Sequence, residues 1–334
     1  MKQLLSLVVV TVMCLSVSAQ KTKTKSKSTT RAKATWTRSF DLSVYAGQAG
    51  GKNWASGGES FSLAENAFLN GFINRKAGRW YWNNSIIASF GMINSNSAGF
   101  RKNDDKMDYY STLGLSMKKK TNLAYAAAFN FRSQFWKGYD HDYLNQGIKR
   151  RTSGFFAPAY ITIAPVGVEL APTKLNAKGS FNAFAGLAAR ATIVSNAPYS
   201  YAYQGGVIPA NLVNEKNQAS TERSVAEMYG VDPNKTIRYQ GGPYIAATYT
   251  KQIVKNVTLM GRFDALSDFY NNEGANIDLF MTNTFSLKVN NWLSAVYSID
   301  VAYDDNVRKF GYFKNKTGTQ VKSILGVGIT AKLK

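Results

Sequence analysis

Apolar and polar residues alternate along almost the whole chain, and this alternation constrains the fold more than any other feature. In residues 123–136, Leu123, Tyr125 and Phe129 fall on one parity, whereas Asn130 and Arg132 fall on the other. Neighbouring side chains of a β-strand point to opposite faces, so a period of two predicts strands with one apolar face. Twelve such segments are expected, at 39–47, 57–73, 79–94, 106–118, 122–137, 154–173, 178–195, 238–250, 254–268, 275–288, 291–303 and 321–333.

The lengths of these segments and of their connections predict the architecture. Many segments exceed ten residues, whereas strands of soluble proteins usually have about 5–6 residues and a tilted strand that crosses a bilayer needs about 9–11. Connections alternate strictly between short ones, at 74–78, 118–121, 174–177, 251–253 and 289–290, and mostly longer ones, at 48–56, 95–105, 138–153, 196–237, 269–274 and 304–320. This pattern is typical of a closed antiparallel transmembrane β-barrel with short periplasmic turns and long extracellular loops.

Lipid explains why such a sheet has to close. The hydrocarbon core offers no hydrogen-bond partners to the backbone, so a spanning sheet cannot keep an open edge. Apolar side chains then face the outer-membrane lipid and lipopolysaccharide, and polar ones face the lumen. This arrangement accounts for a mean hydropathy of only −0.25 in a chain that we expect to span a membrane. A secreted β-rich adhesin remains the soluble alternative.

The N-terminal residues predict export from the cytoplasm. Residues 1–19 combine the basic Lys2, an apolar stretch and the small-residue site Val17-Ser18-Ala19, as in a cleaved signal peptide. Cleavage after Ala19 removes Cys14, the one cysteine of the chain. Residues 20–38 are rich in Lys, Ser and Thr and contain no acid, so we expect a disordered basic arm. Residues 39–334 are then left for the barrel, with 196–237 as its longest extracellular loop.

Basic residues gather at the short connections. The chain has a formal net charge of +21, and no acid stands between the bases of these turns. Those bases are Arg75, Lys76, Arg79, Lys118, Lys119, Lys120, Lys174, Lys178, Lys251, Lys255, Lys288, Lys332 and Lys334. An even strand count also puts the arm on this periplasmic side. The expected partners are an anionic periplasmic protein, anionic headgroups or peptidoglycan, and the alternative is a solvated spacer. We expect no nucleic-acid binding, because a barrel wall offers no recognition helix or stacking platform.

Charged residues of both signs share the inward parity of several strands. The alternation places six of these charged residues in the lumen, at similar heights. They are Arg132, Arg190, Arg262, Asp264, Asp278 and Asp300. Two interpretations remain open, a salt-bridge plug that satisfies a polar interior and a selectivity constriction in a narrow pore.

A set of short motifs resembles a known family. Asn53-Trp54-Ala55-Ser56-Gly57-Gly58 is similar to the Asn-Trp-x-x-Gly-Gly signature of an uncharacterised outer-membrane β-barrel family of Bacteroidetes-type Gram-negative bacteria, which carries a domain-of-unknown-function label. Further matches, such as Trp82-Asn83-Asn84 and Leu325-Gly326-Val327-Gly328, follow in order over about 45–330. The signature residues are Asn53, Trp54, Gly57 and Gly58. The resemblance implies an outer-membrane location and no particular activity.

The sequence gives little support for a catalytic or metal-binding site. One Cys and one His exclude a Cys/His zinc site, and no Gly-x-Ser-x-Gly elbow accompanies His141. The pairs Asp104-Asp105 and Asp304-Asp305 contain calcium-type oxygen ligands, but charged loop stems are the favoured interpretation. We therefore expect no enzyme, cofactor or metal site. The predicted function is a narrow channel or a structural or accessory envelope component, and the alternative is a barrel-borne hydrolase acting on lipid or glycan.

Overall fold

The computed structural model describes nine stretches of the chain. These are residues 34–50, 61–118, 122–143, 148–174, 179–195, 226–232, 235–271, 273–307 and 316–333. The signal peptide and most of the basic arm, residues 1–33, lie outside them, as do residues 51–60 and most of the 196–237 loop. The barrel lies within one compact unit, Ala34–Lys334.

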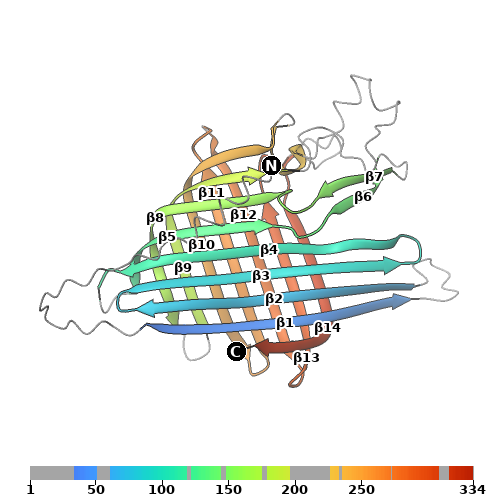
Figure 1. The fold of residues 1–334 in the computed structure, drawn as a ribbon, viewed down its shortest axis with the longest axis horizontal. Coiled ribbons are helices and arrows are strands. Elements are labelled where there is room, and N and C mark those ends of the chain that lie inside the picture. Colours follow the sequence, from blue (N-terminus) through green and yellow to red (C-terminus); the bar gives the residue numbers. More distant parts are fainter. Residues whose placement is uncertain are drawn as a thin grey trace, which may run out of the picture. The chain divides into compact units, whose positions relative to one another are not determined.

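Twelve antiparallel strands form a closed ring, as predicted (Figure 1). The ring runs β1-β14-β13-β12-β11-β10-β9-β8-β5-β4-β3-β2, and pairing of β1 with β14 from Phe40↔Leu333 to Ala46↔Val327 closes it. The strands are β1 (Thr35–Gly50), β2 (Phe61–Ala77), β3 (Trp80–Ser95), β4 (Gly99–Ser116), β5 (Leu123–Ser133), β8 (Ala159–Lys174), β9 (Gly179–Ile193), β10 (Ile237–Val254), β11 (Val257–Asp268), β12 (Glu273–Lys288), β13 (Leu293–Tyr303) and β14 (Gln320–Leu333).

The predicted alternation of faces is confirmed by burial. On β5, Leu123 and Tyr125 are exposed on the outer face, whereas Ala124 and Ala126 are buried. On β14, Leu325 is 72% exposed. The outer face is thus an apolar surface suited to lipid, while the inner face carries the polar residues, as a transmembrane β-barrel requires.

Two expected loops contain strands instead. In the expected 138–153 loop, β6 (Gly138–Tyr143) and β7 (Ile148–Ser153) pair with each other as a hairpin, and among the described strands they pair with no other (Figure 1). The expected 95–105 loop is wrong, because β3 and β4 continue and only residues 96–98 separate them. The charged run in that segment suggested solvent, but Asp104 is buried. The pairing of β3 with β4 shifts register between Gly91 and Met92, next to Asp104.

The first strand also begins earlier than expected. β1 starts at Thr35, so the last residues of the expected arm belong to the sheet. There Trp36 lies opposite Arg75 of β2, whose guanidinium carbon is 5.6 Å from the centroid of the indole ring. Within the 196–237 loop the structure shows a short 3-10 turn, Glu227–Tyr229, and residues 221–225 lie outside the described part. In the described part of the chain, no helix has the length and apolar character needed to cross a membrane.

Replacing Leu325 with Arg tests the lipid-facing surface. Leu325 lies in the middle of β14, opposite Tyr297 of β13. An arginine on the lipid face at mid-depth costs about 2–4 kcal/mol, falling to about 0–1 near the interface. We therefore expect Leu325→Arg to lower the free energy of unfolding in lipid vesicles by about 2–4 kcal/mol. Val289→Arg, at an exposed residue of the β12–β13 turn, is the matched control and should change it little. Equal effects of the two variants would contradict the assignment of the lipid face.

Candidate functional site: the ion-pair network of the lumen

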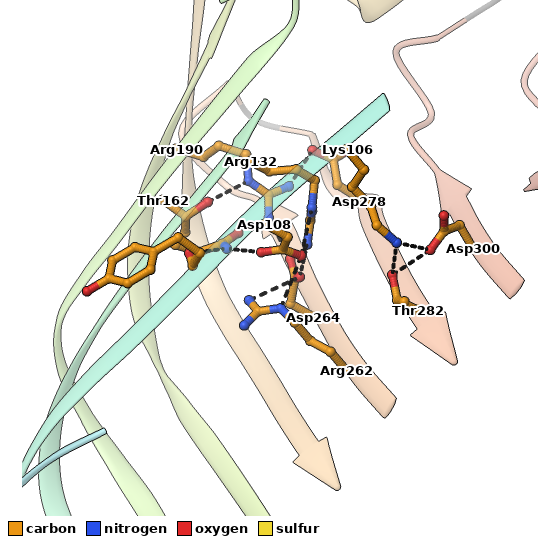
Figure 2. Close-up of polar contacts among 12 residues, drawn as sticks. Lys106, Asp108, Arg132, Thr162, Arg190, Arg262, Asp264, Asp278, Thr282 and Asp300 are labelled. Atoms are coloured by element: carbon orange, nitrogen blue, oxygen red, sulfur yellow. Dashed lines mark hydrogen bonds and ion pairs between the residues drawn. The ribbon is translucent and has the colours of Figure 1, made fainter. Parts of the chain in front are cut away.

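Five of the six predicted lumen residues meet in one buried network (Figure 2). Arg132 comes from β5, Arg190 from β9, Arg262 and Asp264 from β11, and Asp278 from β12. All have the inward parity that the sequence predicted. A sixth member, Asp108 of β4, completes the group with an exposed fraction of 3%.

Asp264 is the centre of this network and is fully buried. Its Oδ1 accepts a hydrogen bond from Arg132 Nη2 at 2.7 Å, and its Oδ2 accepts one from Arg190 Nη2 at 3.2 Å. The Nη2 atom of Arg262 lies 3.6 Å from Oδ1. One carboxylate is therefore surrounded by three guanidinium groups.

Two further carboxylates balance the arginines. Asp108 accepts hydrogen bonds from Arg132 at 2.9 Å and from Asn130 at 2.7 Å, and Arg262 Nε lies 3.4 Å from it. Asp278 accepts a hydrogen bond from Arg190 Nη1 at 3.2 Å. Three acids thus face three arginines, and this pairing is what allows so many charges to remain buried.

These contacts join strands that are distant in the ring. β4 and β11, which carry Asp108 and Arg262, are five positions apart in a ring of twelve, so they stand almost opposite each other. Arg132 and Asp264 join β5 to β11, four positions apart. The side chains therefore reach across the lumen and meet directly instead of lining separate walls.

Asp300 belongs to a second group, which corrects the single cluster predicted from the sequence. It accepts a hydrogen bond from Lys106 Nζ of β4 at 2.6 Å, and Lys322 Nζ of β14 lies 3.1 Å from it. Lys322 also pairs with Asp104. Figure 2 shows Lys106 reaching Asp300 and Thr282 beside the arginine group. Parity alone could not separate the two groups, because the height of each residue depends on the stagger between strands.

Aromatic rings and a buried acid extend this polar interior. The guanidinium of Arg132 lies 4.2 Å from the ring centroid of Phe280, and that of Arg262 lies 4.0 Å from the ring centroid of Tyr110. Glu169 of β8 is fully buried and accepts hydrogen bonds from Tyr81 at 2.7 Å and from Thr112 at 3.0 Å. Sequence reasoning missed Asp108, Lys106, Lys322 and Glu169, although the inward parity of Asp108 on its strand could have pointed to it.

A cavity of about 360 Å³ adjoins both groups. Its polar lining includes Lys106, Arg132, Asp300 and Lys322, whereas Tyr160 and Phe280 supply aromatic surface. Arg132, Tyr160, Asp300 and Lys322 lie toward the loop-side ends of their strands, whereas Lys106 and Phe280 lie near the middle of β4 and β12.

Acidic residues gather at the loop-side end of β12 and β13. Asp304 and Asp305 follow the end of β13, and carboxylate oxygens of Asp278, Asp304 and Asp305 lie within 4.8 Å of one another. Arg238 Nη2 lies 3.3 Å from Asp304. Burial and the carboxylate of Asp278 raise the pKa of Asp304 to about 7, although Arg238 acts in the opposite direction.

The other sequence candidates have different positions. Asn53, Trp54, Gly57 and Gly58 lie outside the described residues. His141 is on β6 of the hairpin, and its ring packs edge-on against Tyr139. In the pair Asp104-Asp105, Asp105 is bound by Lys102 at 2.8 Å and by the backbone N–H groups of residues 135 and 136. Both acids lie within strand β4, so the expectation of a charged loop stem is wrong.

The fold and the site define this chain as an outer-membrane-type transmembrane β-barrel whose lumen is crossed by ion pairs. Residues 46–139 match the model of a family described as "Protein of unknown function (DUF3078)", which confirms the resemblance to an uncharacterised family over that segment. No curated protein matches the chain.

Solved structures of three barrel proteins were also found. The NanC porin is 9% identical with a TM-score of 0.30, covering 87% of this chain and 98% of its own. The translocator domain of the autotransporter NalP from Neisseria meningitidis is 9% identical with a TM-score of 0.27. The match covers 88% of this chain and 87% of the translocator domain. OmpT of Vibrio cholerae is 7% identical with a TM-score of 0.27. The match covers 90% of this chain and 97% of the OmpT chain.

Proposed function

We propose that this protein is a non-enzymatic outer-membrane barrel with a closed lumen, which acts as a structural or accessory component of the envelope. The observation that carries this proposal is the direct contact of Arg262 and Arg132 with acids on distant strands. A selectivity constriction needs charged groups that line a water-filled path. Here the opposite charges meet each other, which favours a plug over a constriction.

The second group of ion pairs supports the same proposal. Lys106 of β4 meets Asp300 of β13, and the shorter way around the ring between these strands, through β1, is five positions long. The arginine group joins β4 to β11 the other way around the ring. Residues on β4 are thus tied to both remote sides of the barrel, so ion pairs cross the lumen in two directions.

A barrel-borne hydrolase is the less favoured function. Such an enzyme needs a histidine in hydrogen-bond reach of a nucleophile on a rigid scaffold. His141 instead lies on β6, which pairs with β7 and is not a strand of the ring. Catalysis at His141 would require the hairpin itself to provide the scaffold.

Solute flux tests the closed lumen. The purified full chain is reconstituted in liposomes, and swelling is followed by light scattering in an isotonic solution of a pentose sugar. We expect the same swelling rate as for protein-free liposomes. An open general porin, reconstituted in parallel at the same protein-to-lipid ratio, should swell rapidly. Porin-like swelling of the present protein would overturn the proposal in favour of a channel.

For the periplasmic side we propose an anionic partner, with peptidoglycan as the first candidate. Bases of the short turns are exposed, among them Arg75, Arg79, Lys118, Lys251 and Lys288. If the signal peptide is cleaved after Ala19, residues 21–33 add further bases to this edge. Charge of one sign attracts polyanions over a Debye length of about 8 Å at physiological salt and about 3 Å at 1 M.

Deleting residues 21–33 should leave the barrel inserted but weaken its co-sedimentation with purified peptidoglycan at low salt. The effect should vanish toward 1 M salt, because screening removes the attraction. A variant of equal length, with the bases of residues 21–33 replaced by Ser, separates charge from length and should behave like the deletion. If the full chain and both variants co-sediment equally at low salt, the arm is a spacer.

A further inference from the structure

The cavity beside the two ion-pair groups is accessible to solvent on one side. Lys322 and Asp300, which line it, have side chains that are 38% and 20% exposed. Arg132, which also lines it, is 13% exposed, and its partner Asp264 is fully buried. Exposure thus falls from the pair of Lys322 and Asp300 toward the arginine network, so a small solute can enter beside Lys322.

The charged side chains of the cavity lining are already paired with opposite charges. Among the described residues, three bases and three acids line the cavity. The pairs that neutralise them are Lys106–Asp300, Lys322–Asp300, Arg132–Asp264, Lys102–Asp105 and Arg238–Asp304 (Figure 2 shows the first and the third). A charged ligand would have to separate one of these pairs and leave a partly buried charge without its partner. The lining therefore favours a neutral ligand.

Hydrogen-bonding groups of the lining remain for such a ligand. Among the described residues, Lys322 Nζ contacts the carboxylates of Asp104 and Asp300, which leaves the third N–H donor of its ammonium group. Gln320 precedes Lys322 by two residues on β14, so its amide shares the inward parity and lines the cavity as well. The ligand should thus carry several hydroxyl or carbonyl groups.

Aromatic side chains form another part of the wall. Tyr160 and Phe280 both line the cavity, and their ring centroids lie 5.2 Å apart. The face of an aromatic ring is negative, so it attracts the weakly positive C–H groups of a sugar ring. The cavity volume of about 360 Å³ is at the small end of the usual range of about 300–1,000 Å³ for ligand pockets, which suits a single ring.

We propose that this cavity binds one ring of a neutral sugar, either a free monosaccharide or the terminal residue of a glycan. Tyr160 and Phe280 face the C–H groups of the ring, and Gln320 and Lys322 bind its hydroxyls. The ion pairs stay intact when such a ligand binds. The alternative is a polar cavity that holds only water. Sugar binding goes beyond the closed lumen and can fail separately from it, because liposome swelling tests the lumen and binding tests the cavity.

Saturation-transfer NMR tests the binding of sugars to the purified full chain in a detergent without a sugar headgroup. The neutral probes are glucose, galactose, mannose and N-acetylglucosamine. We expect at least one of them to bind with a dissociation constant of about 1 mM, as suits so small a ligand. Absence of saturation transfer to all four at about 10 mM, well above that constant, means that the cavity holds only water and overturns the proposal.

Charged sugars test the preference for a neutral ligand. Glucuronate and glucosamine carry one negative and one positive charge on the ring of glucose, and each should bind about tenfold more weakly than the best neutral sugar, because an ion pair must separate. Tighter binding of either charged sugar overturns the proposal. The methyl glycoside of the sugar that binds distinguishes the two sources. Equal affinity means that the cavity admits the end of a glycan, and weaker binding restricts it to a free sugar.

A variant that fills the cavity locates the sugar. Ala302 of β13 lines the cavity opposite Gln320, so Ala302→Leu occupies part of its volume and should weaken binding by about tenfold or more. Ala295→Leu is the matched control, because Ala295 lies on the same strand with the outward parity and should leave the affinity unchanged. Heat-modifiable migration in gels verifies folding. Wild-type affinity in folded Ala302→Leu overturns the proposal. If that variant does not fold, Gln320→Leu, which removes the amide at similar volume, decides by the same criterion.

Discussion

Replacing Asp264 with Asn should lower the free energy of unfolding of the barrel by about 3–5 kcal/mol, the usual cost of breaking a buried ion pair by removing one partner. Asp264 is fully buried and faces the guanidinium groups of Arg132, Arg190 and Arg262. The substitution preserves shape, so the loss comes from charge. Three buried arginines would then share the two remaining carboxylates, Asp108 and Asp278.

Urea unfolding in lipid vesicles, followed by tryptophan fluorescence, measures this loss. Asp232→Asn is the matched control, because it removes an acid of the same type from a pair with Lys235 whose two side chains are 63% and 66% exposed. Solvent screens such a pair, so the control should unfold like the wild type. An Asp264→Asn variant as stable as the control would show that the arginine network contributes little to the barrel.

Replacing Arg262 with Ala should convert a closed barrel into one that conducts ions. Arg262 fills the space between β4 and β11, and its guanidinium lies 3.4 Å from Asp108 and 4.0 Å from the ring centroid of Tyr110. Truncation removes this cross-lumen contact and leaves an excess of negative charge. Any path that opens there should therefore select cations, because an uncompensated carboxylate in the lumen attracts them.

Planar-bilayer recordings under a salt gradient measure both conductance and selectivity. Lys235→Ala, which removes a base from an exposed pair, is the control and should leave the barrel closed. Anion-selective or unchanged currents in Arg262→Ala would contradict the role assigned to Arg262. The stability of the same variant should fall as well, since Asp108 and Asp264 each lose one of their arginines.

Period-two patterning was sufficient to predict the barrel itself. Strand β5 shows why: Tyr125 and Ala126 differ in exposure because the sheet separates lipid from lumen at every step. The same parity predicted an inward position for Arg132, Arg190 and Arg262, and in the structure all three contact Asp264. The twelve period-two segments supplied the even strand count, although one connection expected to be long, 95–105, consists only of residues 96–98.

Which charges meet could not be predicted, because parity gives the face of a residue and not its height or its partner across the barrel. Asp300 shares its parity with Asp264, yet it pairs with Lys106 and Lys322 in a separate group. Asp108 was missed although its strand was expected from 106 onward. The β6–β7 hairpin escaped prediction for another reason, since its charged residues at 140–142 resemble a solvated loop.

Single-channel recording of the wild-type protein tests the central claim most directly. The full chain is inserted into a planar lipid bilayer at neutral pH, with its folded state verified by heat-modifiable migration. The ion pairs that join β4 to β11 and to β13 predict a closed barrel, so insertion should produce no sustained conductance steps. Stable, ohmic steps from the folded wild-type protein would contradict the account, because ions would then pass where Arg262, Asp108 and Asp264 are assigned to close the lumen.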